Sequence, residues 1–330
     1  MIRGRLALFL TAIILAKVGS FRILHSVRRN LNNVFSFQLS MNSDAYNQLL
    51  SNNPIVLVAQ NAARQAGKLI IDGSGTIDLT NGVESKIGSR DIVTVVDKNA
   101  QDTIKEVIFN AFPNHNFLGE EDIPAGIEAS KAAINKFKDV ENLWIVDPID
   151  GTTNFAHGMP LSGVIIAFSS YGKVLYGIIY DPFHDEMFIA GKNMGAYLNG
   201  IKIQCCKTKQ LCDSVVATGS PPNILALEAC LRATTLISPE VRTVRMLGSA
   251  AIMLSWVAIG RLTAYFEADL NAWDLAAGSL IIKEAGGEVT DSWGNEFQLS
   301  TRNLVASNGH IHSALLEYMI KSKMWIIETV

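Results

Sequence analysis

The sequence predicts a layered fold of the α/β or α+β class, and three observations support this prediction. Short β-type runs alternate with helical segments along most of the chain, which is typical of sheets covered by helices. Hydrophobic residues make up 48% of the chain and charged residues 18%, a composition that excludes disordered and fibrous proteins. The length of 330 residues suffices for about two globular units or one large two-part fold.

The first half of the chain is predicted to contain two helices followed by strands. Residues 45–73 carry apolar side chains at helical spacing up to Gly73 and form the first predicted helix. A second helix is predicted to follow Asp97 and to end before Pro113, with Ile104 on its apolar face. Runs of β-type residues predict strands at 116–118, 143–146, 163–168 and 174–180, and a polar helical segment is predicted over 124–141.

The second half of the chain continues this alternation. Strands are predicted at 215–218, 243–246 and 263–267, and helices at 223–233, 248–257 and 273–285. The last of these helices is closed by Gly286 and Gly287, because glycine readily takes the backbone conformation that ends a helix. The weakest boundary lies near residues 190–200, so the body is predicted to divide into halves at 43–195 and 196–330.

The distribution of charge limits the possible partners. The net charge is −3, but residues 1–43 contain six basic and no acidic residues, so the body holds 22 basic against 31 acidic residues, a charge of −9. Because such a body does not attract phosphate backbones or anionic lipid, we expect neither nucleic-acid binding nor stable membrane insertion of the mature protein. The cysteines match no CxxC pair and are interpreted as reduced, small buried hydrophobes: Cys205, Cys206, Cys212 and Cys230.

The first 42 residues are predicted to be a targeting leader. Residues 1–20 are signal-like, because an early basic pair precedes an apolar run, 6–16, that is too short to span a bilayer. Residues 21–42 are rich in Arg, Ser and Asn and lack acids, as organelle transit peptides do. The two in series resemble the bipartite leaders of algae with complex plastids, which have a Phe after the signal cleavage point, as Phe21 would be here. A plastid is the favoured destination, with a mitochondrion or the secretory pathway as alternatives.

The segment 143–157, LWIVDPIDGTTNFAH, is the most informative for chemistry. Asp147 and Asp150 are predicted to lie where a buried strand ends, on a turn that Pro148 keeps from becoming helical. Gly151 and two threonines follow, as at the start of a helix, where free backbone N–H groups bind anions. Two acids beside a helix N-terminus that can bind phosphate would repel that phosphate unless a hard divalent cation lies between them. The all-oxygen ligands indicate that this cation is magnesium. For an isolated DxxD, the ordinary interpretation would be that Asp147 forms a turn and Asp150 caps a helix.

Three further acids occupy comparable positions. Glu120 begins the acidic run 120–122 directly after a predicted strand, although most acidic runs are solvated loops. Asp274 lies at the start of a predicted helix, where an isolated acid is usually an N-cap. Asp97 ends the β-like run 86–97, so it is predicted to be a carboxylate at the end of a strand.

Three motifs together resemble the inositol monophosphatase family. They are GEED at 119–122, WIVDPIDGTTNF at 144–155 and AWDLAAGSLIIKEAGG at 272–287, and the resemblance runs from about Tyr46 to the C-terminus. It implies a layered αβαβα sandwich of the inositol monophosphatase and sugar phosphatase type, usually paired as a homodimer. The half at 43–195 would then carry most metal ligands, and the half at 196–330 would complete the active site.

The resemblance also implies roles for individual residues. The metal ligands would be Glu120, Asp147, the backbone carbonyl of Ile149, Asp150 and Asp274. The residues that orient and help to deprotonate the attacking water would be Asp97 and Thr152, with Glu120 contacting that water through the metal. The substrate contacts would be Asp150, Gly151 and Thr152 around the phosphate, and Ala250 and Glu267 near the sugar hydroxyls. Lys86 and Asp91 would belong to a more peripheral part of the site, a mobile loop. Ser249 would lie in the family's Gly-Ser/Thr-Ala-Ala stretch, and Asn271 falls where relatives differ in a way that bears on the substrate.

The activity that the resemblance implies is that of an inositol-phosphate phosphatase, a phosphoric monoester hydrolase. Two or three Mg²⁺ ions per site would activate a water and neutralise the leaving oxygen, giving in-line attack without a phosphoenzyme, and lithium sensitivity would accompany them. Inositol monophosphate is the default substrate. The alternative substrates are histidinol phosphate, galactose 1-phosphate and fructose bisphosphate. The alternative to an enzyme is a non-catalytic regulatory protein that binds metal. The sequence contains no GxxxxGK[ST], GxSxG or HExxH signature of another chemistry.

Overall fold

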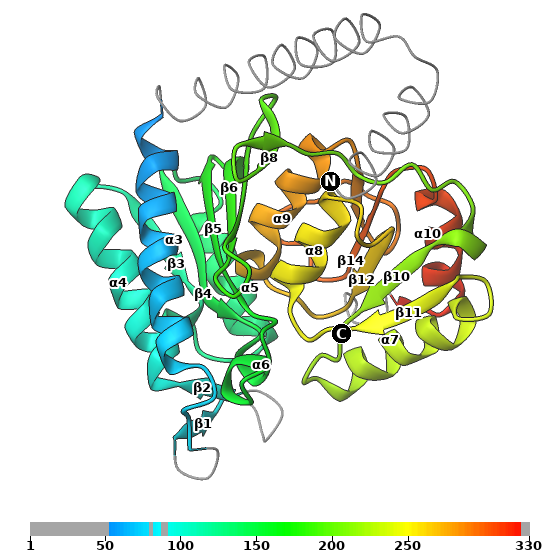
Figure 1. Ribbon diagram of the computed structural model, residues 1–330, viewed down its shortest axis with the longest axis horizontal. Coiled ribbons are helices and arrows are strands. Elements are labelled where there is room, and N and C mark those ends of the chain that lie inside the picture. The colour runs from blue at the N-terminus through cyan, green and yellow to red at the C-terminus, as the bar shows by residue number, and fades with distance from the viewer. Residues whose placement is uncertain (1–52, 79–81, 87–91, 325–330) are drawn as a thin grey trace, which may run out of the picture. The chain divides into compact units, whose positions relative to one another are not determined.

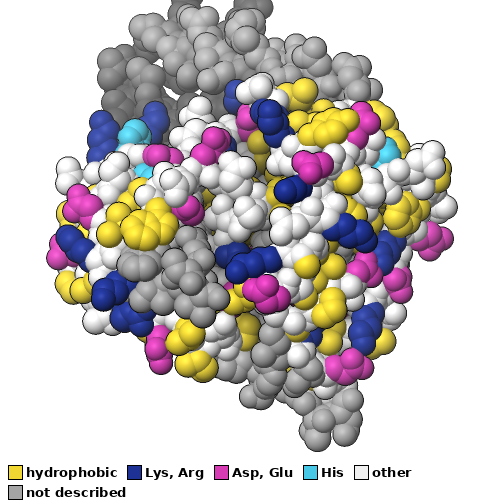
Figure 2. Space-filling view, turned by 180° about the vertical axis from the view of Figure 1, so that it is seen from behind, with side chains coloured by type: hydrophobic (Ala, Val, Ile, Leu, Met, Phe, Trp, Pro, Cys, Tyr) yellow, Lys and Arg dark blue, Asp and Glu magenta, His cyan; other side chains and the backbone are white. Residues whose placement is uncertain are grey.

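The computed structural model describes residues 53–78, 82–86 and 92–324, which belong to one compact unit of the chain (Figure 1). The predicted leader over 1–42 and Asp91 lie outside the described residues. Within the part that is described, no helix is both long enough and apolar enough to cross a membrane. On the face seen in Figure 2, described basic and acidic side chains are interspersed, and neither forms a continuous patch.

Two packed helices form the first layer of the fold. Helix α3 (Pro54–Gly73) starts where the Asn53 side chain accepts a hydrogen bond from the Ile55 N–H at 3.0 Å. Helix α4 (Val95–Ala111) lies beside it, and together they cover one face of the larger sheet (Figure 1). The prediction of a helix ending at Gly73 is confirmed for the described residues, and its part at 45–52 lies outside them.

The second layer is a seven-stranded sheet in the order β3-β4-β5-β6-β7-β8-β9. Strands β3 and β4 are parallel, and every other neighbouring pair is antiparallel. Its strands are β3 (Asn116–Gly119), β4 (Leu143–Asp150), β5 (Gly163–Ser170), β6 (Lys173–Asp181), β7 (Glu186–Gly191), β8 (Gly195–Leu198) and β9 (Ile201–Lys202). The predicted division of the body at residue 195 stays a prediction.

Helices α8 (Ala250–Ala258) and α9 (Ala272–Glu284) form the third layer, between the two sheets (Figure 1). Almost every residue of both helices is buried, so neither helix shows an amphipathic pattern in the sequence. Gly177 of β6 lies against the α9 backbone, where a Cβ atom would be 2.7 Å from the Ala277 carbonyl oxygen. The glycine therefore permits the close approach of helix and sheet.

A five-stranded sheet and two outer helices complete the fold. The sheet has the order β11-β10-β12-β14-β13, and its strands are β10 (Val215–Thr218), β11 (Thr243–Met246), β12 (Ala264–Glu267), β13 (Glu288–Asp291) and β14 (Leu304–Ser307). Helices α7 (Ile224–Ile237) and α10 (His312–Lys321) pack together on its outer face. The layers therefore alternate helix, sheet, helix, sheet and helix, which confirms the predicted αβαβα sandwich.

Several smaller elements connect these layers. A two-stranded antiparallel ribbon, β1 (Val83–Ser85) with β2 (Ile92–Thr94), precedes α4. The short helices η2 (Glu120–Asp122) and α6 (Thr152–Ala156) follow β3 and β4, and α5 (Ile127–Phe137) confirms the helix predicted over 124–141. A further short helix is η3 (Leu211–Asp213).

Three predictions about local structure are wrong or incomplete. Asp97 lies in the first turn of α4 rather than at a strand end, because Thr94, three residues earlier, caps the start of the helix. Strand β4 continues through Asp147 and Asp150, with a register shift between them, so the acids belong to the strand and not to a following turn. All four cysteines are free thiols, as predicted, but only Cys230 is buried and Cys212 is exposed.

Candidate functional site

Three carboxylates from different parts of the chain meet beside the end of β4. Glu120 begins η2, Asp147 lies on β4, and Asp274 is in the first turn of α9. One ligand oxygen from each lies within 4.8 Å of the others. Burial, together with the charge of Glu120, raises the pKa of both Asp147 and Asp274 well above the usual range. This arrangement holds like charges together at a cost that a bound cation would remove.

The donor set of this carboxylate cluster fits a hard divalent cation. All three donors are carboxylate oxygens, which magnesium and calcium prefer over nitrogen or sulfur ligands. The backbone of Ile149 lies next to the cluster, because its N–H donates to Asp147 Oδ1 at 3.0 Å. Ile149 also lines the cavity into which the cluster opens. The geometry therefore supports a metal site made of oxygen ligands.

Asp150 lines the same cavity but points its carboxylate toward another element. Its Oδ2 accepts a hydrogen bond from the Ala251 N–H at 2.8 Å and another from the Ser249 hydroxyl, and its Oδ1 accepts one from the Ala250 N–H at 3.2 Å. These donors lie at the start of α8, 99 to 101 residues away in the sequence. Burial raises the pKa of Asp150 to about 6 even though these hydrogen bonds lower it. Its role as a metal ligand stays a prediction.

Asp97 and Thr152 form a hydrogen-bonded pair beside the cluster. The Thr152 hydroxyl oxygen lies 3.0 Å from Asp97 Oδ1 and 3.0 Å from the Ile149 carbonyl oxygen. The other oxygen of Asp97 accepts hydrogen bonds from the Thr94 N–H at 2.8 Å and the Thr94 hydroxyl at 2.6 Å. Because Asp97 is only 1% exposed, desolvation raises its pKa to about 6. The pair can therefore accept a proton near neutral pH.

The predicted substrate contacts line one cavity of about 470 Å³. Gly151, Ala250 and Glu267 all belong to its wall, with the carboxylate cluster, and Asn271 lines it as well. Gly151 has φ +85°, a conformation that glycine adopts without strain, and it turns the chain from β4 into α6. The structure therefore brings the predicted phosphate contacts and sugar contacts to the same opening.

Glu267 is held tightly at the end of β12. It is 6% exposed, it accepts a hydrogen bond from the Tyr265 hydroxyl, and burial raises its pKa to about 8. Gly219 leaves the room for its carboxylate, because a Cβ atom at position 219 would lie 1.8 Å from the Glu267 carboxyl carbon. The space for Glu267 thus depends on the absence of a side chain at Gly219.

Lys86, a basic residue predicted to belong to the site, forms an ion pair with the carboxylate cluster. Its Nζ donates to Glu120 Oε1 at 2.8 Å and to Glu121 Oε1 at 3.0 Å. Burial lowers the pKa of Lys86, but the charges of both glutamates outweigh burial and raise it above its usual value. Lys86 therefore neutralises part of the acidic run, and the predicted role of Asp91 lies outside the described residues.

Several residues of the site escape prediction from the sequence alone. Tyr265 and Gly219 shape the environment of Glu267, and neither was assigned a role from the sequence, although Tyr265 lies in the strand predicted at 263–267. Ser249 stands in a noted stretch, but its contact with Asp150 was not predicted. The one local signal for Ser249 is its position before a buried helix, where its hydroxyl accepts from the Ile252 N–H at 3.2 Å.

The raised pKa values give a testable dependence of stability on pH and metal. Asp97, Glu121 and Glu267 have pKa values of about 6, 7 and 8, above the values near 4 that unfolded chains show. Between its unfolded and folded pKa, such an acid keeps a proton only in the folded state, so stability is lost as the pH rises through this window. We therefore expect the Tm of the metal-free protein to be about 4 °C lower at about pH 8 than at about pH 6.

Added magnesium is expected to raise the Tm more at the higher pH, because the acids are then charged and repel one another. Thermal unfolding by circular dichroism, with EDTA or with magnesium, measures both effects. A Tm that rises with pH in EDTA, or a magnesium shift that is equal at the two pH values, would contradict the assignment of these protonation states.

Comparisons with known proteins agree with one another. The model of the Inositol monophosphatase family matches residues 51–324. The protein named Inositol monophosphatase 3 of Solanum lycopersicum is 38% identical over 264 residues, which cover 79% of this chain and 94% of that protein. The protein named Nus factor SuhB of Escherichia coli (strain K12) is 37% identical over 273 residues, covering 81% and 96%. The solved structure of a Thermotoga maritima IMPase matches with a TM-score of 0.70 at 34% identity, covering 79% and 95%.

Proposed function

The chain belongs to the inositol monophosphatase family, and we propose that it is a magnesium-dependent phosphomonoesterase that hydrolyses inositol monophosphate to inositol and phosphate. The meeting of Glu120, Asp147 and Asp274 beside one cavity is the observation that carries this proposal. Membership of a phosphatase family implies a small phosphorylated substrate. A homodimer, inhibition by lithium and delivery to a plastid after removal of the leader remain further parts of the proposal.

The residues around the cavity are proposed to divide the chemical work. Glu120, Asp147 and Asp274 would hold the cation, with the Ile149 carbonyl and Asp150 completing its ligands. When bound, magnesium neutralises charge on the phosphoryl and leaving oxygens and lowers the pKa of a water. Binding magnesium requires such a cluster of acids. The raised pKa values of Asp147 and Asp274 support this role, because a bound cation would stabilise their charged forms.

Proton transfer is proposed to pass through Thr152 to Asp97. The Thr152 hydroxyl lies within hydrogen-bond distance of Asp97, so it can receive a proton from a water and donate its own to that carboxylate. A pKa of about 6 suits a general base that works near neutral pH, since such a group is mostly ionised and still accepts a proton. The backbone N–H groups of Gly151 and Thr152 would orient the phosphate, and Glu267 and Ala250 would orient the alcohol.

Two alternatives remain for the activity. One is a phosphatase for histidinol phosphate, galactose 1-phosphate or fructose bisphosphate, which would use the same acids. The other is a regulatory protein without catalysis, which is favoured by the similarity to the protein named Nus factor SuhB. The pair of Asp97 and Thr152 favours catalysis, because a protein that only binds metal has no use for a positioned proton acceptor beside the ligands.

Phosphate release by the purified protein tests the proposal. We expect magnesium-dependent release from inositol 1-phosphate, with weaker release from galactose 1-phosphate, histidinol phosphate and fructose 1,6-bisphosphate, and no release in EDTA. A clear preference for another member of this panel would replace the substrate and keep the chemistry. Folded, metal-binding protein that releases phosphate from none of them would overturn the proposal in favour of the regulatory alternative.

A further inference from the structure

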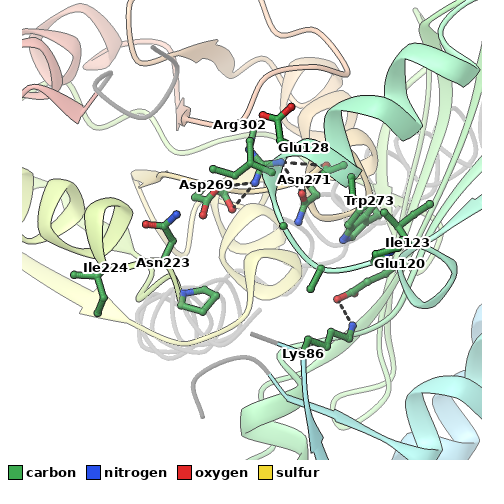
Figure 3. A pocket seen from close by; sticks show the side chains of 17 residues that line it. Lys86, Glu120, Ile123, Glu128, Asn223, Ile224, Asp269, Asn271, Trp273 and Arg302 are labelled. Carbon is green, nitrogen blue, oxygen red and sulfur yellow. Dashed lines mark hydrogen bonds and ion pairs between the residues drawn. The ribbon is translucent and has the colours of Figure 1, made fainter. Parts of the chain in front are cut away.

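A second cavity adjoins the one that holds the carboxylate cluster, and the proposed reaction does not use it (Figure 3). We call it the side cavity; its volume is about 660 Å³, against about 470 Å³ for the first cavity. Glu120, Pro222, Asp269 and Asn271 line both, so the two cavities meet along these residues. A substrate bound beside Glu120 and Asn271 therefore lies close to the entrance of the side cavity.

The cationic side chains in the wall of the side cavity are already paired. Arg302, with a side chain 12% exposed, is bound to the Asp269 carboxylate and donates to Asn271 Oδ1 at 2.7 Å (Figure 3). Lys86, with a side chain 16% exposed, is bound to Glu120 on the opposite side (Figure 3). In the described part of the chain, this wall thus offers a second phosphate no unpaired lysine or arginine, and the paired acids would repel it.

Much of the remaining wall is apolar. It is formed by Ile123, Pro124, Ile127, Pro222 and Ile224. Ile224 is a large hydrophobic residue that begins α7 and yet is 55% exposed, so its side chain has contact area to give to a ligand. A polyol with hydroxyls on every carbon gains little from such a wall, whereas an apolar group gains from leaving water.

Two hydrogen-bond donors in this wall, the Trp273 indole N–H and the Arg302 Nε–H, have no acceptor among the described residues. Trp273 is 5% exposed and lines the side cavity (Figure 3), and its indole N–H has no hydrogen-bond partner among the described residues. A buried donor favours an acceptor, and an indole N–H can only donate. An ether, carbonyl or ring-nitrogen acceptor on an otherwise apolar group matches the unpaired donors and the apolar wall.

We propose that the side cavity receives an uncharged, partly apolar substituent on the alcohol of the substrate. This inference rests on the proposed phosphomonoesterase function and names its substrate class more closely. Besides compact polyol phosphates such as inositol monophosphate, the site then accepts phosphomonoesters whose alcohol extends past the metal site with an apolar group that carries an acceptor, and it disfavours bisphosphates. The metal site fixes the phosphate, and the side cavity selects the alcohol.

A matched substrate series tests this inference with the purified protein. Glycerol 1-phosphate, its 3-O-benzyl ether and glycerol 1,3-bisphosphate present similar primary phosphates and differ at the far end of the alcohol. We expect kcat/KM to be about tenfold higher for the benzyl ether than for glycerol 1-phosphate, as for an added apolar group that fills a pocket. The bisphosphate is expected to be the poorest substrate of the three.

Two single substitutions on α7 locate the effect. Ile224→Trp fills the side cavity and is expected to lower the ratio of kcat/KM for the benzyl ether over glycerol 1-phosphate about tenfold. Leu225→Trp is the control, because Leu225 is 52% exposed on the same helical turn but does not line the side cavity. Both positions are exposed, so both variants are expected to fold.

The outcomes separate this inference from the proposed function. A benzyl ether that is no better than glycerol 1-phosphate, a bisphosphate that is the best substrate, or a ratio that Ile224→Trp and Leu225→Trp change equally would overturn the inference and leave the phosphatase in place. The absence of magnesium-dependent release from these compounds and from inositol 1-phosphate alike would overturn the proposed function, and the inference with it.

Discussion

Replacing Asp147 with asparagine is expected to lower kcat/KM by about a thousandfold or more, because a carboxylate that would hold the cation becomes neutral. Asp147 is 2% exposed and lies with Glu120 and Asp274 in the carboxylate cluster, so bulk water does not compensate for the loss of its charge. The fold is expected to survive. The asparagine oxygen can still accept the hydrogen bond from the Ile149 N–H, and the loss of one like charge relieves repulsion in the metal-free protein.

Steady-state kinetics at saturating magnesium, calorimetric titration with magnesium and thermal unfolding in EDTA measure these effects on Asp147→Asn. Asp122→Asn is the matched control, because Asp122 belongs to the same acidic run as Glu120 but pairs with Lys105 away from the cavity. We expect the control to keep its turnover and its magnesium affinity. A near-normal rate for Asp147→Asn at saturating magnesium would exclude Asp147 from the metal site. The same loss is expected for Asp150→Asn.

Replacing Asp97 with asparagine is expected to lower kcat by a factor of about 10² to 10⁴, the usual contribution of a general base. Magnesium affinity is expected to change little, since Asp97 is not one of the three clustered carboxylates. The amide can keep the hydrogen bonds from Thr94 that start α4, but it cannot accept a proton relayed through Thr152. This variant therefore separates proton transfer from metal binding.

The pH profile of kcat/KM gives the sharper readout for Asp97. Wild-type activity is expected to rise with pH through about 6 as this carboxyl loses its proton, and Asp97→Asn is expected to lose that limb of the profile. Asp102→Asn, an exposed acid on the same helix, is the control that should retain the limb. An unchanged profile in Asp97→Asn would contradict the role of general base.

Several elements were predictable from local signals, and others were missed altogether. The strand predicted at 243–246 coincides with β11, and the helix predicted at 273–285 lies within one residue of α9 at each end. The prediction contained none of β7, β8, β9, β13, β14 or α10. Strand β9, Ile201–Lys202, has only two residues and exists through its pairing with β8, so no pattern in its own sequence could reveal it.

Asp97 shows how a local pattern can mislead. The run from Val93 to Val96 is β-branched throughout, which favours a strand, and the prediction placed Asp97 at its end. The structure ends the strand at Thr94, where hydrogen bonds between Thr94 and Asp97 start a helix instead. The capping chemistry of two residues outweighs the propensity of the run.

The candidate acids were predictable as acids at the ends of elements, but their meeting was not. Glu120, Asp147 and Asp274 approach one another because α9 packs against the seven-stranded sheet, which depends on buried surfaces far from the motifs. The contact between Ser249 and Asp150 joins residues 99 positions apart and has no local signature. The resemblance supplied the grouping that residue patterns alone could not.

Gly219 has a consequence for the mutational tolerance of this chain. The atom that any substitution would add there meets the Glu267 carboxylate, which is the movable end of a side chain rather than backbone, so the change displaces Glu267 more than it strains the fold. Selection for folded protein would therefore accept alanine at Gly219, whereas selection for turnover would reject it if Glu267 orients the alcohol as proposed. Sequence drift at Gly219 would then be limited more by catalysis than by folding.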